Sequence, residues 1–343
     1  MASNLDKKAL TNLLLSEGAK VLSHPEISRP YWGGRSPRWI CRFFNKYGCV
    51  PVEGGALRIN ELTEKFIPVQ KSVSTSLLEL PTGNLNVSHS HIEGSLLDSS
   101  YAQYNQNPKE VQLQPIQSIT RFPTRLQTLY SNVEDQLFDQ LALIAETIYE
   151  TKENLIFNHP EYGLLHQVKP ALKMTHDGPP SPSLLDDMLS RVWKMPDVWV
   201  MHPEALQAFH DEANKLGISL ESKEFFGSAL TCWRGLPILP TNKLYLINDH
   251  NRDKSAIEKT VYNLDDRMRG QSKTHVVLLR IGEKKQGAIS LFPKGMTGSK
   301  AFPLIDIDFM GIDEFGNAKY MLSTYSAIAI LTPGALAVAE VVV

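Results

Sequence analysis

A long polar stretch in the first third of the chain limits the folds that this sequence can adopt. Residues 53–110 are rich in Asn, Ser, Gly and Pro, and the region offers only short β-like runs, such as Lys65–Val69 and Val111–Ile116. Such a stretch has too few apolar residues to form a core of its own, and long polar insertions in compact domains usually serve binding. We therefore expect residues 53–110 to be an interaction loop.

The rest of the chain has an ordinary globular composition. Its 343 residues carry 35 Lys and Arg against 37 Asp and Glu, a net charge of −2, and 42% of them are hydrophobic. This length predicts about two domains and excludes disorder of the whole chain. Because the charge is near neutral and no long block of like charges occurs, the sequence lacks the footprint of a nucleic-acid or anionic-membrane binder. We expect the partners to be proteins or small molecules.

The cysteines and the C-terminal run bear on the cellular compartment. Cys41, Cys49 and Cys232 form neither a disulfide framework nor a zinc motif, which fits a reducing cytosol. The apolar run from Ala327 to Val343 is interrupted by a Pro-Gly pair and by a glutamate, so we do not expect it to anchor the chain in a membrane.

The N-terminal region predicts a helix followed by an extended arm. Apolar residues recur at helical spacing from Leu10 to Val21, and from Ile27 to Trp39 Pro and Gly alternate with aromatic residues, which no regular element does. Large aromatics on an irregular arm need a surface to bury against, on this domain or on a neighbouring copy. These residues are Tyr31, Trp32 and Trp39.

Beyond the polar stretch the periodicity predicts a mixed α and β architecture. One long amphipathic helix is expected over 124–158, with Glu146 off its apolar stripe. After a rigid turn at 178–182, a strand leads into a helix that has Pro203 at its first position and Gly217 just past its end. That strand is Val198–Met201. The other expected strands are Leu236–Leu239, Tyr245–Ile247, Val276–Ile281 and a hairpin of Ile305–Gly311 with Tyr320–Leu331.

Two histidines and a glycine-rich run invite a ligand interpretation. His89 and His91 alternate, so on a strand they could share a metal ion, but no third ligand is apparent and solvated imidazoles are the simpler interpretation. The run from Gly295 to Lys300 has its lysine and hydroxyl residue in the reverse order of a phosphate loop, which favours a flexible turn.

Catalytic interpretations compete with structural ones in two further places. Asp249, His250 and Asp253 could supply an acid–base pair, although runs of turn-forming polar residues usually lie in solvent. Cys232 beside Arg234 could be an activated thiolate, although its apolar neighbours predict a buried strand pair. No G-x-S-x-G, G-x-G-x-x-G or H-E-x-x-H motif occurs, so nothing in the sequence favours an enzyme.

The order of the pieces is the most informative signal: an aromatic arm, a long polar β-loop, one long helix, an α/β unit and a closing hairpin. This order resembles the major capsid proteins of tailed bacteriophages and the related encapsulins. The motifs are most similar to family two encapsulins of the branch without a cyclic-nucleotide-binding insert, from about Trp39 onward. They are FNHPEYGLLH (157–166), GPPSP (178–182), LSRVWK (189–194), MHPEA (201–205), WRGLPI (233–238), LRIGEKKQG (279–287), FMGI (309–312) and LTPGAL (331–336).

The resemblance implies an α+β fold of the tailed-phage capsid type. Its parts would be an N-terminal arm (1–52), an extended loop with its β-strands (53–122), a peripheral domain with a long spine helix (123–185), an axial domain (186–300), and the hairpin and C-terminus of the peripheral domain (301–343). Arms and loops that cannot bury themselves would then be covered by neighbouring copies in a closed assembly.

The resemblance also implies a function. The chain would be a structural shell protein and no enzyme, without a cofactor of its own, forming an icosahedral nanocompartment in the cytoplasm around a cargo enzyme. The implied cargo is a pyridoxal-phosphate cysteine desulfurase, with a role in sulfur metabolism or storage. The arm residues Tyr31, Trp32 and Trp39 would lie between subunits. The implied fivefold pore falls on a loop at about 214–224, with Asn214, Lys215, Glu221, Lys223 and Glu224 as lining residues.

Two other classes of function stay open on the sequence alone. One is a phage or prophage capsid protein with the same fold and DNA inside. The other is a soluble enzyme that uses Asp249 and His250.

Overall fold

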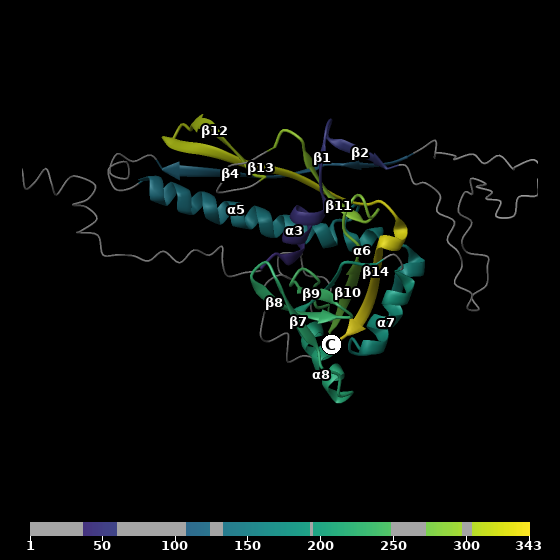
Figure 1. Cartoon of the computed structure of the whole chain (residues 1–343). Coiled ribbons are helices and arrows are strands. Elements are labelled where there is room, and N and C mark those ends of the chain that lie inside the picture. The colour runs from purple at the N-terminus through teal and green to yellow at the C-terminus, as the bar shows by residue number, and fades with distance from the viewer. Residues whose placement is uncertain (1–36, 60–107, 124–132, 193–194, 248–271, 297–303) are drawn as a thin grey trace, which may run out of the picture. The chain divides into compact units, whose positions relative to one another are not determined.

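The structure is a computed structural model that forms two compact units, residues 1–55 with 113–343 and residues 56–112. It describes residues 37–59, 108–123, 133–192, 195–247, 272–296 and 304–343, without the side chains of 123 and 133–139. In the smaller unit, β2 (Ala56–Ile59) pairs antiparallel with β3 (Lys109–Gln112). The larger unit holds two sheets and the long helix, and Figure 1 shows its elements.

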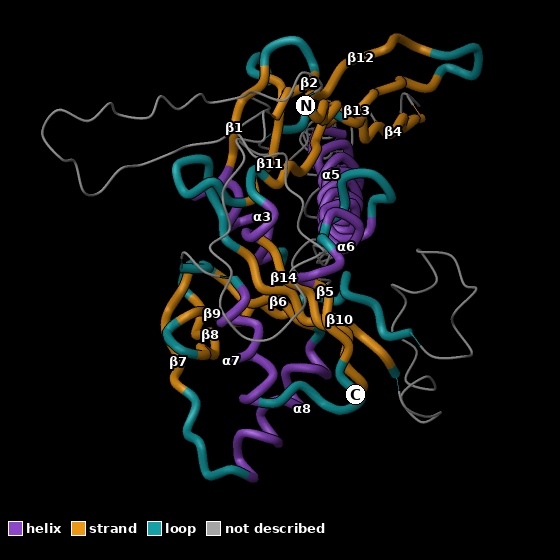
Figure 2. Tube along the Cα trace, turned by 90° about the vertical axis from the view of Figure 1, so that its right-hand side faces the viewer, coloured by secondary structure: helices purple, strands orange, loops and turns teal. Residues whose placement is uncertain are grey.

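A seven-stranded sheet forms one part of the larger unit. One buried face, which includes Trp199, Ile238 and Leu278, packs on two helices, α7 (Pro182–Arg191) and α8 (Pro203–Lys215). Both helices therefore cover the same side of this sheet (Figure 2). In sheet order the strands are β5 (Lys173–Thr175), β14 (Leu336–Val342), β10 (Lys273–Leu279), β6 (Val198–Met201), β9 (Leu236–Pro240), β8 (Ser228–Trp233) and β7 (Glu221–Phe225).

Side-chain caps fix where these two helices begin. The Ser181 hydroxyl accepts the backbone N–H of Leu184 at the start of α7, and Nδ1 of His202 accepts the backbone N–H of Glu204 at the start of α8. Proline follows each cap at the first helical position, where a missing N–H costs nothing. His202 is only 3% exposed, and burial lowers its pKa from 6.5 to about 4.

A second sheet carries the long helix. The strands β1 (Cys49–Val52), β11 (Ala288–Pro293), β13 (Asn317–Ile330) and β12 (Asp306–Ile312) follow in that order, and β4 (Gln114–Pro123) also pairs with β13. The helix α5 (Val133–Asn158) lies along β4 and β13 (Figure 1). The shared core includes Ile116, Phe122, Leu141, Ala145, Ile148 and Leu322.

A tight turn ends α5 and begins the short helix α6 (Leu164–Gln167). Nδ1 of His159 accepts the backbone N–H groups of Glu161 and Tyr162, and the His159 and Tyr162 rings stack with centroids 3.6 Å apart. Gly163 donates its N–H to the His159 carbonyl. A Cβ added at Gly163 would lie 2.4 Å from that carbonyl oxygen, so the turn accepts only glycine there.

Most elements predicted from periodicity are confirmed. These are the strand Val198–Met201, the helix that starts at Pro203, the end of the long helix at Asn158, and the closing hairpin. The first residues of the predicted long helix, 124–132, lie outside the described residues, as does the run Lys65–Val69.

Three predictions need correction. The run Val111–Ile116 is two strands of different units, β3 and β4, with Leu113 between them. Tyr245–Ile247 forms only an isolated bridge from Ile247 to Lys273. The range 301–343 was assigned to one domain, yet its last strand, β14, pairs with β10 in the seven-stranded sheet.

The turn after α5 gives a stability prediction. Replacing Gly163 by alanine forces a methyl group against backbone atoms of His159 and Phe157, which cannot move without breaking the turn. We expect G163A to lower the free energy of unfolding by about 2–3 kcal/mol or more, measured by denaturant titration. The matched control is G295A, because a Cβ at Gly295 meets no atom within 4 Å. Equal stability of the two variants would contradict this account of the turn.

The buried cap of α8 gives a pH prediction. Because the folded pKa of His202 lies below its ordinary value, the unfolded chain takes up the proton first as the pH falls from 6.5 towards 4. We expect this to remove roughly 3 kcal/mol of stability at the acid end, and none above pH 6.5.

The comparison is H202N, which keeps a capping side chain and removes the titration. Its free energy of unfolding should fall less between about pH 7 and about pH 4.5 than that of the natural chain. Some pH dependence should remain, because burial also lowers the pKa of His275. An unchanged pH dependence in H202N would rule out His202 as its source.

Candidate functional site

The described residues lend little support to a catalytic or metal centre. His89, His91, Asp249, His250 and Asp253 lie outside them, as does 297–300 of the glycine-rich run. Among the residues that the structure describes, no three His, Cys, Asp or Glu side chains are grouped to hold a metal ion. The candidates that rest on 89, 91 and 249–253 stay predictions.

Cys232 is a buried residue of β8, as its apolar neighbours predicted. It is 3% exposed, and burial raises the pKa of its thiol, the opposite of activation. The neighbouring guanidinium points elsewhere, since Nη2 of Arg234 lies 2.6 Å from Oδ2 of Asp186. Nε1–H of Trp233 donates to the same carboxylate at 2.9 Å. The thiol is therefore a small core group.

The predicted pore segment is found at the end of α8 and on β7, and it is not one loop. Asn214 and Lys215 are the last residues of α8, residues 216–220 form the connection, and Glu221, Lys223 and Glu224 lie on the edge strand β7. All five side chains are exposed. The expectation of a loop over 214–224 is thus correct only for its middle, because β8 supplies a hydrogen-bonding partner for 221–225.

An aromatic cluster holds the turn between β7 and β8. Phe226 and Gly227 form this two-residue turn with φ angles of 50° and 77°. Such turns favour Asn-Gly, and a bulky side chain at positive φ is strained. The Phe226 ring packs edge-on against Phe43 with centroids 5.3 Å apart, and Nζ of Lys46 lies 5.1 Å from the centroids of both Phe226 and Tyr47. We call Phe43, Lys46, Tyr47 and Phe226 the aromatic clasp.

The aromatic clasp ties the edge hairpin to a segment far away in the sequence. Phe43 ends the helix α3 (Trp39–Phe43), and Lys46 and Tyr47 lie in the helical turn η2 (Phe44–Gly48) that follows it. Four residues in a row on β7, 221–224, are exposed, so the strand itself adds little burial. The position of the candidate pore residues on β7 therefore depends on pairing with β8 and on the contacts that residues 43–47 make with the turn.

Trp39 requires a correction. The sequence predicted an aromatic on an irregular arm, buried against this domain or a neighbouring copy, but Trp39 begins the helix α3 and is 6% exposed within its own chain. Its ring also lies 5.1 Å from the Arg42 guanidinium. Tyr31 and Trp32 lie outside the described residues, so their place between subunits stays a prediction.

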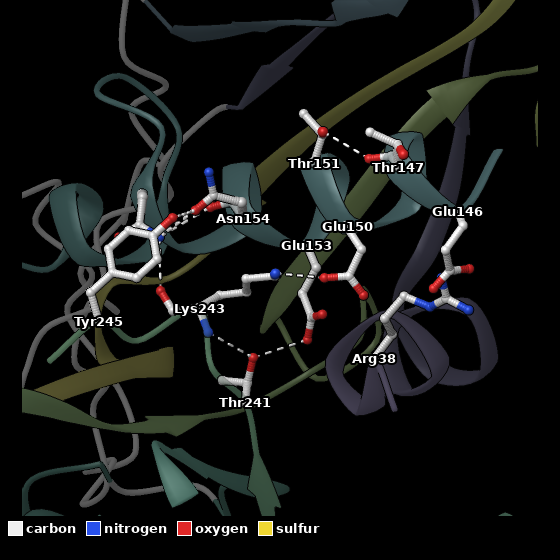
Figure 3. A network of polar contacts seen from close by, with 11 residues as sticks. Arg38, Glu146, Thr147, Glu150, Thr151, Glu153, Asn154, Thr241, Lys243 and Tyr245 are labelled. Carbon is white, nitrogen blue, oxygen red and sulfur yellow. Dashed lines mark hydrogen bonds and ion pairs between the residues drawn. The ribbon is translucent and has the colours of Figure 1, made fainter. Parts of the chain in front are cut away.

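The last half of α5 is joined to the segment after β9 by a buried polar network (Figure 3). Nζ of Lys243 pairs with Glu150 at 2.5 Å, and the Thr241 hydroxyl donates to Glu153 at 3.1 Å. Lys243, Thr241 and Glu153 are 4%, 3% and 1% exposed. We call this network the spine joint, and its remaining members are Arg38, Glu146, Asn154, Asn158 and Tyr245.

Three further contacts complete the spine joint. The Tyr245 hydroxyl donates to Oδ1 of Asn154, and Nδ2 of Asn158 donates to the Lys243 carbonyl at 2.9 Å. Burial raises the pKa of Tyr245 to about 12, so the hydroxyl keeps its proton. Arg38 pairs with Glu146 near the start of α3. Glu146, which was predicted to lie off the apolar stripe of the helix, is 7% exposed.

Sequence reasoning missed the spine joint, although a signal was available. Glu146, Glu150 and Glu153 recur at i, i+4 and i+7, which places three carboxylates on one face of the helix. Such a stripe on a long helix usually faces solvent. Only the fold brings Lys243 and Arg38 to it from far away in the sequence.

The comparisons with known proteins decide the family. The SrpI-like family profile, described as type 2A encapsulin shell protein SrpI-like, matches residues 70–343. The curated type 2A encapsulin shell protein SrpI of Synechococcus elongatus is 31% identical over 341 residues, which cover 99% of this chain and 96% of the relative. This chain belongs to the SrpI-like encapsulin shell proteins.

The solved structures agree with the encapsulin assignment. The holo-SrpI encapsulin complex of Synechococcus elongatus is 30% identical, covers 94% of each chain and aligns with a TM-score of 0.70. The capsid of a native GTA particle aligns with a TM-score of 0.57 at 10% identity, which shows a shared fold alone. The predicted α+β capsid fold is confirmed. In the described part of this encapsulin chain, no helix is long and apolar enough to cross a membrane.

The aromatic clasp of the encapsulin chain gives a testable prediction. In F226N the turn gains its favoured residue, but the ring that holds the hairpin is lost. We expect amide hydrogen exchange over 221–230 to become about 10-fold faster, because the hairpin opens more often. The melting temperature should change by only a few degrees.

The control for F226N is F226Y, which keeps the ring and should leave exchange at its natural rate. If the turn residue alone set the hairpin's stability, F226N would instead slow the exchange. That result would contradict the role of the clasp.

Proposed function

We propose that copies of this chain close into an icosahedral nanocompartment that encloses a cargo enzyme. The observation that carries the proposal is membership of the encapsulin shell family over almost the whole chain. The fold shared with the capsid of the GTA particle supports a closed shell. In a closed symmetric assembly each copy covers the contact surface of the next, so no open fibre forms.

The smaller unit supports assembly on physical grounds. Its described part is a two-stranded sheet, β2 with β3, and an isolated pair of strands is only marginally stable in water. The Arg58 guanidinium and the Glu110 carboxylate on its surface form an exposed ion pair at 3.3 Å, which adds little stability. A neighbouring subunit would supply the missing surface.

The proposed cargo is a cysteine desulfurase that carries pyridoxal phosphate. This finer assignment is supported by the resemblance of the motifs to the encapsulin branch without a cyclic-nucleotide-binding insert. In this proposal the shell contributes no cofactor of its own, lies in the cytoplasm and serves sulfur metabolism or storage. It binds neither nucleic acid nor a membrane.

The proposed pore lies where α8 ends and β7 begins. Asn214, Lys215, Glu221, Lys223 and Glu224 are exposed and carry both signs of charge, which suits the passage of small polar substrates. Nζ of Lys215 lies 2.7 Å from Glu212, so this lysine is already partly neutralised. The acidic residues of β7 would therefore dominate the field at the opening.

The experiment has two arms. The chain is expressed alone and beside its neighbouring genes, and particles are purified by size and viewed by negative-stain electron microscopy. We expect uniform hollow particles in the first arm. In the second arm we expect filled particles that carry the yellow colour of bound pyridoxal phosphate and release alanine from L-cysteine.

The outcomes separate the levels of the proposal. Hollow particles that never take up a pyridoxal-phosphate enzyme would overturn the cargo and keep the shell. Particles that contain nuclease-protected DNA would favour a phage-type capsid. A small soluble oligomer in both arms would overturn the shell itself.

A further inference from the structure

One oxygen of a buried carboxylate on α5 has no partner among the described residues. Glu146 is 7% exposed, and its Oε2 pairs with Arg38, whereas its Oε1 is buried without a hydrogen bond. Buried carboxylate oxygens nearly always accept a hydrogen bond, because an unsatisfied one costs free energy. The place beside Glu146 therefore lacks a donor that the described part of the chain does not supply.

The described part of the chain begins at this same place. Residue 37 is the first described residue, and the Arg38 guanidinium next to it also lies 5.2 Å from the centroid of the Tyr149 ring on α5. The Arg38 backbone has φ 48° and ψ 46°, a left-handed conformation that an arginine rarely adopts unless its surroundings hold it there. The 36 residues before it thus reach the larger unit at the surface of α5.

The residues after Arg38 show which way the chain runs along α5. Arg38 contacts Glu146, and further on burial and then the charge of Glu153 raise the pKa of the Cys41 thiol to about 12. The chain therefore moves towards the C-terminal end of α5 as the residue number rises. Followed backwards, the segment before residue 37 leads towards the N-terminal end of the same helix.

A count of residues gives the register of that segment on α5. An extended segment advances about 3.3 Å per residue and an α-helix about 1.5 Å, so three residues of the first span about seven of the second. Counted back from the pair of Arg38 and Glu146, Arg35 comes level with Asp139. Asp139 and Glu146 are two helical turns apart, so they lie on the same face of α5.

The charges of the two segments are complementary. The helix α5 has six acidic residues and one basic residue, Lys152. Residues 27–38 contain no acidic residue and three arginines, which are Arg29, Arg35 and Arg38. A guanidinium suits a carboxylate because its planar fork can donate two hydrogen bonds at once. The segment before residue 37 thus carries the charge that α5 lacks.

The exposed stripe of α5 gives this segment no such partner. Gln140, Leu143, Thr147 and Thr151 are exposed and carry no charge. The hydroxyls of both threonines donate to carbonyl groups of their own helix, at 3.0 Å for Thr147 and 2.8 Å for Thr151. The acidic face with Asp139 and Glu146 is therefore the better place for an arginine-rich segment.

We propose that residues 33–37 of each chain lie along its own α5, where the Arg35 guanidinium pairs with the Asp139 carboxylate and the segment donates a hydrogen bond to Oε1 of Glu146. The occupant of this face is thus a named part of the same chain. The contact fixes the direction in which the N-terminal arm leaves the subunit. The inference goes beyond the proposed function, because it holds whether or not the copies assemble.

The first test uses paired cysteines in the full chain. A short bis-maleimide should link R35C/D139C within one chain, so that the denatured protein keeps the mass of one chain and its digest contains the joined peptides. The matched control is R35C/T151C, because Thr151 is exposed and lies about 18 Å further along α5. The natural chain measures the background from its own thiols, Cys41, Cys49 and Cys232.

Each crosslinking result decides the proposal. A link within one chain that is at least 10-fold more abundant in R35C/D139C than in R35C/T151C supports the contact. Equal links in the two variants would mean that the segment moves freely over α5. A ladder of joined chains from R35C/D139C would mean that the segment lies on a neighbouring copy. Either result overturns the proposal, as does the absence of any link.

The second test exchanges the charges of the proposed pair. R35E sets a like charge beside Asp139, so we expect amide hydrogen exchange over α3 to become about fivefold faster, because the segment that enters α3 is released. The double variant R35E/D139R restores the pair and should return the exchange to its natural rate.

The control for the charge exchange is R29E. By the same count Arg29 falls beyond Val133, the first described residue of α5, so R29E should leave the exchange over α3 unchanged. Natural exchange rates in R35E would overturn the proposal, and so would fast exchange that persists in R35E/D139R.

Discussion

Glu153 lies buried on α5 and Glu150 lies partly buried beside it, because the segment after β9 brings Thr241 and Lys243 against them. Removing one partner of such a pair leaves an unpaired charge in a poorly solvated place. The free energy lost is then far greater than the pair contributes to stability. The spine joint therefore acts mainly as a constraint on geometry. The apolar stripe of α5 packs on β4 and β13, whereas its polar residues meet the segment that leaves the seven-stranded sheet. One helix thus sets the relation between the two sheets of the larger unit.

Elements with a local cause were predictable from the sequence, and those with a tertiary cause were not. Pro203 after a capping His202 starts α8 wherever the chain goes, and the run of four buried residues at 198–201 is a strand on composition alone. The burial of Glu146 could not be foreseen, because its partner Arg38 comes from a distant part of the chain. The strand at 221–225 has no apolar pattern, and it forms because β8 pairs with it. Pairing of this kind is invisible in a single sequence.

Several of the motifs that carry the family resemblance contain turns with steric demands. Gly163 has no room for a methyl group, and a Cβ at Gly287 would lie 2.5 Å from the Arg280 carbonyl oxygen. In the WRGLPI motif, Arg234 and Gly235 both have positive φ, and the Trp233 and Arg234 side chains share the Asp186 carboxylate of α7. These residues fix how the chain changes direction. They identify the fold for that reason, and they say nothing about the contents of a shell.

The distribution of polarity separates the interior of the subunit from its margins. Charged groups are buried at the spine joint, while large apolar groups are exposed on β4, on β12, in the turn after β12 and in the aromatic clasp. This is the reverse of what stability of a lone subunit favours, since burying charge and exposing apolar surface both cost free energy in water. The joint holds α5 and the sheets of one subunit in one geometry. Exposed apolar groups of this kind mark surfaces that bind a partner, and a fixed geometry within each copy is what allows identical copies to close into one assembly.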